Sequence, residues 1–525
     1  MNDQDFYRKI DVPSPRLGTE DRMVLRLAFR NERKLYHRKC DLCKKEIITM
    51  YASDAPYTVY CQNCWWSDKW DAEQYGRDFD FSRPFFEQFN ELMKAIPRIA
   101  LMNKEAENSD YCNFAWRNKN CYLMFTSAEN EDSFYSKRCW KMKNICDCSN
   151  LVSCELCYEC TDCSKCYNCA YLQNSTDCSD CFIGFNLRSC KNCFGCNNLV
   201  QKSYCIYNVQ YSKEEYETKV VELKKNLKEE FKKFLVGPIM RKNMYLLNTE
   251  NSSGTALINC KNSTFCFDSS ELQDCENIFD ASNLKDCQDI NNDDHSELCF
   301  HGVGGESNYM VRYFDICWWN KYLTYCSLCF HSSYLFGCVG LKKGEYQILN
   351  KKYSKEDYED LMARIIEHMK KSKEWGEFFP STVSPFGYNE SVAQDHYPLA
   401  KEQAVKLGFN WREDSEQSLY QGPKVTVPKN IEEVDESITK KILTCEVSGK
   451  SYKITPQELE FYKKMQRPLP KKCFEQRFTE RLARKDPRHL WQRTCSSCSQ
   501  PIESVYAPER PEKVLCEACY LKTVY

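Results

Sequence analysis

Cysteines recur at multiples of three residues through the middle of the chain, and this spacing limits the fold more than any other feature. From 112 to 205 every cysteine except Cys146 falls on one such lattice, and C-x-x-C pairs repeat every twelve residues from Cys154. The nine cysteines of 260–338 follow a lattice of the same kind. Neither an α-helix, with 3.6 residues per turn, nor a flat strand, with a period of two, produces this spacing.

A small parallel β-solenoid accounts for the lattice, because a twelve-residue coil that points one side chain in three inward repeats in this way. Its coils would stack about 4.8 Å apart. A bundle of polyproline-II helices also has a three-residue period, but it needs far more than the 17 Gly and 18 Pro of this 525-residue chain. We therefore predict a mainly β fold with flanking helices, containing two duplicated short β-solenoids.

The two lattice segments are copies of one another. CELCY (154–158) aligns with SELCF (296–300), and FGCNN (194–198) aligns with FGCVG (336–340), both at an offset of 142 residues. A serine-capped helix is expected after each copy, beginning at Ser212 and at Ser354, where it would cover the open edge of the solenoid.

The second copy indicates what the solenoid cysteines do. Three cysteines of the first copy have apolar counterparts in the second, namely Val311 for Cys169, Leu323 for Cys181 and Leu335 for Cys193. Because valine and leucine cannot bind metal, this favours packing of small apolar thiols in a narrow core. A ladder of metal sites and a set of disulfides remain alternatives, above all in the dense run 154–196.

The two ends of the chain are also copies, at an offset of 455 residues that covers 7–66 and 462–521. Both contain the pattern C-x2-C-x17-C-x2-C, formed by Cys40, Cys43, Cys61 and Cys64 in the first and by Cys495, Cys498, Cys516 and Cys519 in the second. Two cysteine knuckles with a hairpin-length spacer are typical of zinc ribbons. Four thiolates leave no open coordination position, so we predict two structural zinc ions.

A third, incomplete ribbon precedes the last one, at 443–477. It resembles the family described as probable zinc ribbon, through Cys445, Gly449, Phe461, Tyr462, Cys473 and Arg477. Ser448 and Gln476 occupy the other two ligand positions. Two thiolates cannot close a tetrahedral site, so this unit is expected to hold by packing alone.

Basic residues precede both ribbons at helical spacing. They comprise Arg22, Arg26, Arg30, Arg33 and Arg38 in the first copy, and Arg477, Arg481, Arg488 and Arg493 in the second. Steps of three and four residues place most of them on one helix face. A basic face beside a zinc ribbon is a candidate contact for the phosphates of RNA or DNA. The alternative is a solvated face paired with acidic residues of the same chain.

Composition narrows the classes of function. The 73 basic and 75 acidic residues argue against a uniformly basic binder, and no run of eighteen apolar residues exists that would span a membrane. The 36 Cys, with no apolar leader, point to a reducing, cytoplasmic location. No phosphate-loop, dinucleotide or metalloprotease motif occurs, and no small-molecule substrate is indicated. The best acid–base cluster consists of Asp293, Asp294, His295 and Glu297.

These patterns divide the chain into six parts. They are a basic helix with a zinc ribbon (1–66), a helical connector (67–106), solenoid 1 with its capping helix (107–236), solenoid 2 with its capping helix (250–372), a loop, helix and acidic linker (373–440), and the incomplete and C-terminal ribbons (441–525).

Nearly the full length resembles a group of cysteine-rich zinc-ribbon proteins from candidate-phyla bacteria and giant viruses. The resemblance is carried by YCQNCWWSDKWD (60–71), FSRPFFEQF (81–89), WGEFFPSTVSPFGYNESVAQ (375–394) and the C-terminal ribbon. It implies zinc binding but no particular reaction. We expect a non-enzymatic intracellular zinc-binding scaffold that contacts nucleic acid or ribonucleoprotein. The alternatives are an assembly protein that binds only protein partners, and a solenoid enzyme that uses the cluster at 293–297.

Overall fold

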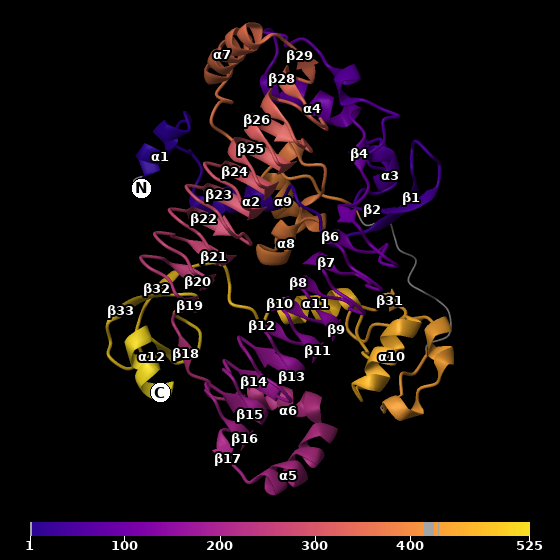
Figure 1. The fold of residues 1–525 in the computed structure, drawn as a ribbon, viewed down its shortest axis with the longest axis vertical. Helices are drawn as coiled ribbons and strands as arrows, with labels where there is room; N and C mark the ends of the chain where they lie inside the picture. Colours follow the sequence, from indigo (N-terminus) through magenta and orange to yellow (C-terminus); the bar gives the residue numbers. More distant parts are fainter. Residues whose placement is uncertain (1–2, 414–424, 429, 525) are drawn as a thin grey trace.

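Two stacks of short β-coils form the centre of the molecule, one purple to magenta and the other salmon in Figure 1. The computed structural model describes residues 3–413, 425–428 and 430–524. Both stacks are parallel β-solenoids of twelve-residue coils, flanked by helices and by a cysteine cluster at each end of the chain. The predicted fold class is therefore confirmed.

Solenoid 1 is a sheet of 13 strands. Adjacent coils pair at a register of twelve residues, so that Phe125 lies beside Lys137 and Ser149 lies beside Thr161. Its strands are β5 (Asn103–Lys104), β6 (Asn113–Trp116), β7 (Phe125–Ala128), β8 (Lys137–Trp140), β9 (Lys143–Cys146), β10 (Ser149–Val152), β11 (Glu155–Tyr158), β12 (Thr161–Ser164), β13 (Tyr167–Gln173), β14 (Phe182–Phe185), β15 (Lys191–Asn197), β16 (Ser203–Ile206) and β17 (Val209–Gln210).

Solenoid 2 is a sheet of 11 strands with the same register, in which Phe300 lies beside Arg312 and Leu323 lies beside Leu335. Its strands are β19 (Leu246–Leu247), β20 (Gly254–Ile258), β21 (Cys266–Ser270), β22 (Glu276–Phe279), β23 (Gln288–Asp294), β24 (Phe300–Glu306), β25 (Tyr309–Trp318), β26 (Lys321–Ser327), β27 (Ser333–Phe336), β28 (Glu345–Ile348) and β29 (Lys351–Lys352).

Left-handed backbone residues explain the three-residue lattice. From Phe114 to Tyr207 every third residue has a positive φ, between 47° and 65°. Each coil of twelve residues therefore turns four corners. Asn and Asp adopt this conformation more readily than most residues, and many corners carry them in hydrogen-bonded ladders; Asn168 Nδ2, for example, donates to Asp180 Oδ1 of the next coil at 2.7 Å.

Cysteine thiols fill the interior of solenoid 1. Each is at most 3% exposed, and all 36 cysteines of the chain are free thiols. The thiols donate to backbone carbonyls, as Cys157 Sγ does to Glu155 O at 3.5 Å and Cys166 O at 3.7 Å. Groups of three or more metal-binding side chains, searched in the described residues, occur only at the two ends of the chain. The geometry therefore favours packing as the role of the solenoid cysteines.

Helices follow each solenoid, as the serine caps indicate. Solenoid 1 is followed by α5 (Lys213–Lys225) and α6 (Leu227–Leu235), and solenoid 2 by α7 (Lys355–Lys371). Ser212 Oγ accepts the N–H of Glu215 at 3.2 Å, and Ser354 Oγ accepts the N–H of Asp357 at 3.1 Å. Helix α5 contacts the last parallel strand of its solenoid, β16, and α7 contacts the corresponding strand, β28.

The remaining elements belong to the ends and connectors. Before solenoid 1 these are α1 (Asp3–Lys9), α2 (Thr19–Leu27), β1 (Tyr36–Lys39), β2 (Glu46–Thr49), β3 (Val59–Tyr60), α3 (Gln62–Trp65), α4 (Phe85–Ala95) and β4 (Arg98–Ile99); β18 (Arg241–Lys242) lies between the solenoids. After solenoid 2 these are α8 (Val392–His396), α9 (Lys401–Lys406), β30 (Leu443–Thr444), β31 (Ser451–Tyr452), α10 (Pro456–Lys464), α11 (Phe474–Leu482), β32 (Trp491–Thr494), β33 (Pro501–Ser504), β34 (Val514–Leu515) and α12 (Glu517–Val524).

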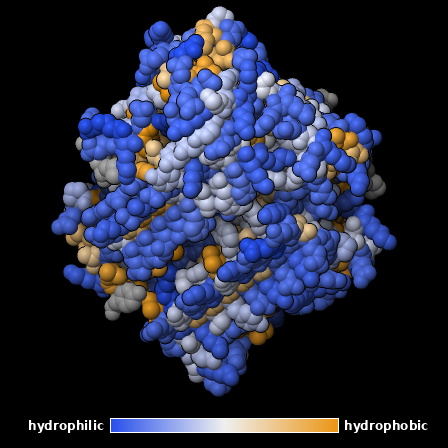
Figure 2. Space-filling model, turned by 45° about the horizontal axis from the view of Figure 1, so that its top comes forward, coloured by the Kyte–Doolittle hydropathy of each residue, from blue (hydrophilic) through white to orange (hydrophobic). Residues whose placement is uncertain are grey.

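The surface is mostly polar. Figure 2 shows one face, on which hydrophilic side chains predominate and hydrophobic ones gather in small patches. None of the helices in the described part of the chain is both long enough and apolar enough to cross a membrane.

Candidate metal centres

The first cysteine cluster is built by a hairpin turn and the start of a short helix. Cys40 and Cys43 lie on the turn between β1 and β2, whereas Cys61 and Cys64 lie at the beginning of α3. Lys44 reverses the chain in the left-handed conformation, and its N–H donates to Cys40 O at 2.9 Å. The four sulfur atoms lie within 4.8 Å of one another.

The second cluster has the same construction and contains Cys495, Cys498, Cys516 and Cys519. Ser499 takes the place of Lys44, with a φ of 59°, and its N–H donates to Cys495 O at 3.0 Å. The Sγ atoms of Cys498 and Cys516 are 3.8 Å apart, as are those of Cys43 and Cys61. The structure thus brings the eight predicted ligands together in two sets of four.

Backbone N–H groups point at the sulfur atoms and favour their anionic form. Cys40 Sγ accepts the N–H of Cys61 at 3.2 Å and that of Cys43 at 3.5 Å. Burial opposes ionisation, but the backbone hydrogen bonds outweigh it and lower the pKa of Cys40 to about 7. The same balance lowers the pKa of Cys495 to about 6. Four converging sulfur donors fit a tetrahedral metal ion.

The incomplete ribbon has the same hairpin turn as the complete ribbons, but it lacks two of the four cysteine ligands. Its hairpin, β30–β31, turns at a left-handed Gly449, as the complete ribbons turn at Lys44 and Ser499. Ser448 Oγ lies 3.6 Å from Cys473 Sγ, while the Gln476 side chain donates to Glu480 at 3.0 Å. Its cysteines, Cys445 and Cys473, are buried and belong to no cluster of three or more metal ligands among the described residues.

The basic residues before the ribbons do not form an exposed face. The buried ones are Arg22, Arg26, Arg30, Arg477, Arg481 and Arg488, each at most 8% exposed. The expectation of a solvent-facing basic surface is wrong, because α2, α11 and the segments that follow these helices place the side chains against the solenoids. Pairing with acidic residues of the same chain does occur, but in the interior. Of the others, Arg33 pairs with Asp395, Arg38 pairs with Asp41, and Arg493 donates to the carbonyls of Tyr506 and Ala507.

Each arginine helix binds the solenoid of the opposite half of the chain. Arg22 and Arg26 of α2 bind Asp289 of solenoid 2 at 2.8 and 3.0 Å, and Arg477 and Arg481 of α11 bind Asp147 of solenoid 1 at 2.8 and 2.7 Å. The two aspartates are 142 residues apart, and the matching arginines are 455 apart. These are the offsets of the two duplications, so one approximate twofold relation joins the solenoids and the ends.

The short strands obey the same relation. Val59 of β3 pairs with Arg98 of β4, which leads into solenoid 1, and Val514 of β34 pairs with Arg241 of β18, which leads into solenoid 2. Each module at the ends of the chain therefore contacts the entry of one solenoid through its cysteine ribbon and the side of the other through its helix.

The solenoids also meet directly. The Arg138 guanidinium forms an ion pair with Asp280, and its Nη2 donates to Asp268 O at 3.0 Å. Arg138 and Asp280 are 142 residues apart, so they occupy the same place in the two repeats. Arg488 binds both Asp268 and Asp280, at 2.8 and 2.9 Å.

The sequence analysis missed these carboxylates. Asp147 and Asp289 lie at left-handed corners of their coils, and nothing local in the sequence marks them as partners of distant arginines. The available signal was that an acidic residue is kept at the same position of both repeats, where most neighbouring positions differ.

The acidic cluster at 293–297 does not converge. Asp293 points into the solenoid, is 4% exposed and accepts Ser296 Oγ at 2.7 Å, and burial raises its pKa to about 7. Asp294 points outward and accepts Ser282 Oγ at 2.8 Å. The remaining acid, Glu297, pairs with Lys285 at 3.3 Å. His295 Nδ1 does lie 3.0 Å from Asp294. The three carboxylates, however, point to different places and are not gathered around a common point.

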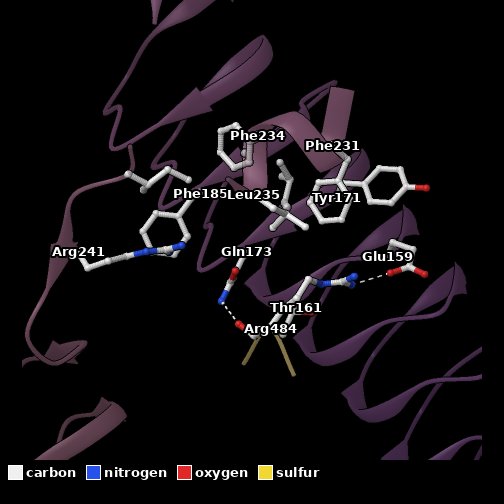
Figure 3. A pocket seen from close by; sticks show the side chains of 13 residues that line it. Glu159, Thr161, Tyr171, Gln173, Phe185, Phe231, Phe234, Leu235, Arg241 and Arg484 are labelled. Carbon is white, nitrogen blue, oxygen red and sulfur yellow. Dashed lines mark hydrogen bonds and ion pairs between the residues drawn. The ribbon is translucent and has the colours of Figure 1, made fainter. Parts of the chain in front are cut away.

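A small cavity of about 20 Å³ lies between solenoid 1, α6 and the segment after α11 (Figure 3). Arg484 points across it to Glu159, at 2.7 Å, and the Gln173 side chain donates to Arg484 O at 3.1 Å. A cavity of this size has room for about one water molecule. It therefore marks a polar seam that attaches the C-terminal module to solenoid 1.

Comparison with known proteins adds no relative to this description, since no family model and no curated protein matches the chain.

Proposed function

We propose that this chain is a non-enzymatic zinc-binding scaffold, in which two structural zinc ions hold the end modules that clamp two β-solenoids together. The observation that carries the proposal is that each four-cysteine module contacts both solenoids. Metal binding to such a module contributes directly to its folding free energy. Zinc would therefore stabilise the junction between the solenoids as well as the ribbon itself.

The end modules also neutralise two buried carboxylates of the solenoids. Asp147 and Asp289 are both fully buried, and each is neutralised only when an end module places two arginines against it. A buried carboxylate without a partner is strongly destabilising. Ordered end modules are thus needed for the solenoids to keep these aspartates in the interior.

Most of the arginines first considered for phosphate binding are used internally. Contact with RNA, DNA or a ribonucleoprotein would have to use another surface, and so would assembly with proteins. A groove on solenoid 1 is lined by several cations.

The number of bound metal ions tests the proposal. Native mass spectrometry and elemental analysis of protein purified under reducing conditions should give two zinc ions per chain. Cys43→Ser and Cys498→Ser should each remove one ion and lower the melting temperature, since three thiolates bind zinc much more weakly than four. Cys445→Ser, in the incomplete ribbon, is the matched control and should leave two ions.

Two results would contradict the proposal. A chain that folds normally without zinc would remove the structural role of the ribbons. Four or more ions in the wild type, of which at least two remain in the Cys43→Ser/Cys498→Ser double variant, would place metal among the solenoid cysteines and favour storage or redox chemistry.

A further inference from the structure

An open groove lies on solenoid 1 between α5 and the end of α10. Its volume is about 680 Å³, within the range of small-ligand sites. Phe182 and the half-exposed ring of Tyr167 come from the solenoid. Lys224 comes from α5, and Lys464 and Arg467 come from the end of α10 and the turn that follows it. The lining contains several cations and no carboxylate.

Arg467 is the central group of this groove. The residue as a whole is only 8% exposed, and its Nε has no hydrogen-bond partner. The guanidinium carbon lies 5.4 Å from the centre of the Phe182 ring, and Lys224 Nζ lies 3.8 Å from the same ring. Two positive charges are therefore held over one aromatic ring.

These charges have no counter-ion in the described part of the chain. No ion pair joins Lys224, Lys464 or Arg467 to a carboxylate there, whereas the fourth cation of the lining, Lys225, pairs with Glu222. Burial lowers the pKa of Arg467, and burial together with the Arg467 charge lowers that of Lys224. Asp180, the acid whose charge acts on Lys224, already accepts the Asn168 amide at 2.7 Å. An anion bound in the groove would relieve this imbalance.

The duplicated half of the molecule provides an internal comparison. The corresponding helices dock in the same way, because Phe6 lies 6.0 Å from Phe300 and Phe461 lies 6.4 Å from Tyr158. There, Arg467 is replaced by Val12, Lys224 by Ile366 and Phe182 by Thr324, and the lysine equivalent to Lys464, Lys9, pairs with Asp286 at 3.0 Å. Arg312, whose counterpart on solenoid 1 is Ala170, donates there to Thr324 and to the carbonyls of Ile10 and Asp11. The seams of the two halves therefore carry different cations with different partners, so the twofold fold itself does not require Lys224 and Arg467.

We propose that this groove binds the phosphate of a nucleotide, with the base on the exposed ring of Tyr167, and that its natural ligand is a single strand of RNA or DNA. Cations beside an aromatic platform are the usual means of holding single strands. A guanidinium stacked on a ring presents its fork edge to a phosphate in bidentate geometry. An acidic peptide would satisfy the charges but would leave the Tyr167 ring without a flat partner. This inference is independent of the zinc stoichiometry.

Fluorescence anisotropy on the full zinc-loaded chain tests the proposal. The probes are labelled oligouridine and oligothymidine of about eight nucleotides, a length within the site sizes of single-strand binders. Adenosine monophosphate and an octaglutamate peptide serve as competitors. Lys224→Ala/Lys464→Ala is compared with Lys370→Ala/Lys371→Ala on α7, which removes the same charge from the equivalent helix of solenoid 2.

The wild type and the α7 variant should bind the oligonucleotides alike, with log K falling against log salt by about 0.7 for each phosphate contact. The groove variant should bind about tenfold more weakly and lose about 1.4 from that slope, because two contacts are gone. Arg467→Lys keeps the positive charge but loses the bidentate guanidinium, so it should also weaken binding. The melting temperature of this variant shows whether the fold persists. Tyr167→Ala should weaken binding with the salt slope unchanged.

Several outcomes would overturn the proposal. These are no oligonucleotide binding by the wild type, an equal loss in the α7 control, or displacement by octaglutamate but not by adenosine monophosphate, which would indicate a protein partner. Tight adenosine monophosphate binding with no gain from a longer strand would support the groove as a nucleotide site but identify a free nucleotide as its source.

Discussion

Asp289 and Asp147 each balance two guanidinium groups while completely buried. Removing a carboxylate from water is costly, and at Asp289 burial by itself would raise the pKa, but Arg26 and Arg22 together lower it below its usual value. Single residues of this kind decide whether the end modules can dock. They also show that strongly basic helices need not serve nucleic acid.

Asp289→Asn should lower the free energy of unfolding by about 3–5 kcal/mol at pH 7, because it leaves two buried arginines with no charged partner. The folded-state pKa of Asp289 is lowered, so the stability that its charge supplies is present above the unfolded pKa of about 3.9 and is lost as the pH falls below it. Urea unfolding at several pH values should therefore show the wild-type and variant curves converging in acid.

Asp78→Asn is a suitable control for that series. Asp78 pairs with Lys351 at 2.6 Å, but its side chain is 76% exposed, so its loss should change stability by less than about 1 kcal/mol. Asp147→Asn should match Asp289→Asn, since the two sites are related by the duplications. A difference between wild type and Asp289→Asn that stays constant down to pH 3 would contradict the electrostatic explanation.

At the scale of elements, the coils and the cysteine ribbons could be predicted because each has a spacing that few other structures share. A left-handed corner at every third residue, as at Asn168, imposes a period that neither helix nor strand has. The docking of α2 and α11 could not be predicted in the same way. Helical spacing places Arg22 and Arg26 on one face, but it does not say whether that face meets water or a carboxylate 263 residues away, as Arg26 meets Asp289.

The corners make a specific prediction about tolerated residues. Lys165 is an exposed corner with a φ of 51°. Lys165→Val should be less stable than Lys165→Asn by about 1–2 kcal/mol, because a β-branched residue is strained in the left-handed region and Asn is favoured there. Thermal or urea unfolding measures the difference.

The control for the corner prediction is an exposed strand position of the same solenoid. Lys191, at the start of β15, is exposed and is not among the residues with a positive φ. Lys191→Val should be at least as stable as Lys191→Asn, since strands favour β-branched residues. The same order of stabilities at both positions would show that the corner conformation does not matter.

At the scale of the whole molecule, the two halves of the chain exchange their ends. The N-terminal helix α2 lies on solenoid 2, whereas the C-terminal helix α11 lies on solenoid 1. The only covalent link between the solenoids is the segment around Val236, which is 86% exposed. Most of the attachment between the halves is therefore noncovalent and buried.

Cutting this link should leave the molecule intact. With a protease site inserted between Val236 and Gly237, the two fragments should appear separately on a denaturing gel and elute together in gel filtration. Addition of a zinc chelator to the cleaved protein should promote their separation, because the clamping modules lose their metal. Fragments that separate while zinc is bound would show that the exchanged ends do not hold the halves together.

The ion pair between Arg138 and Asp280 has a consequence for how such a molecule recognises itself. Two identical repeats would bring a residue against its own copy at this point, and two like charges would repel. Because one repeat carries the cation and the other the anion, each half fits its opposite better than a second copy of itself. The two partners are also tethered, so their meeting does not weaken on dilution. The chain therefore behaves as a covalently linked heterodimer whose two halves stay associated even at low protein concentration. Domain swapping between neighbouring molecules would gain little.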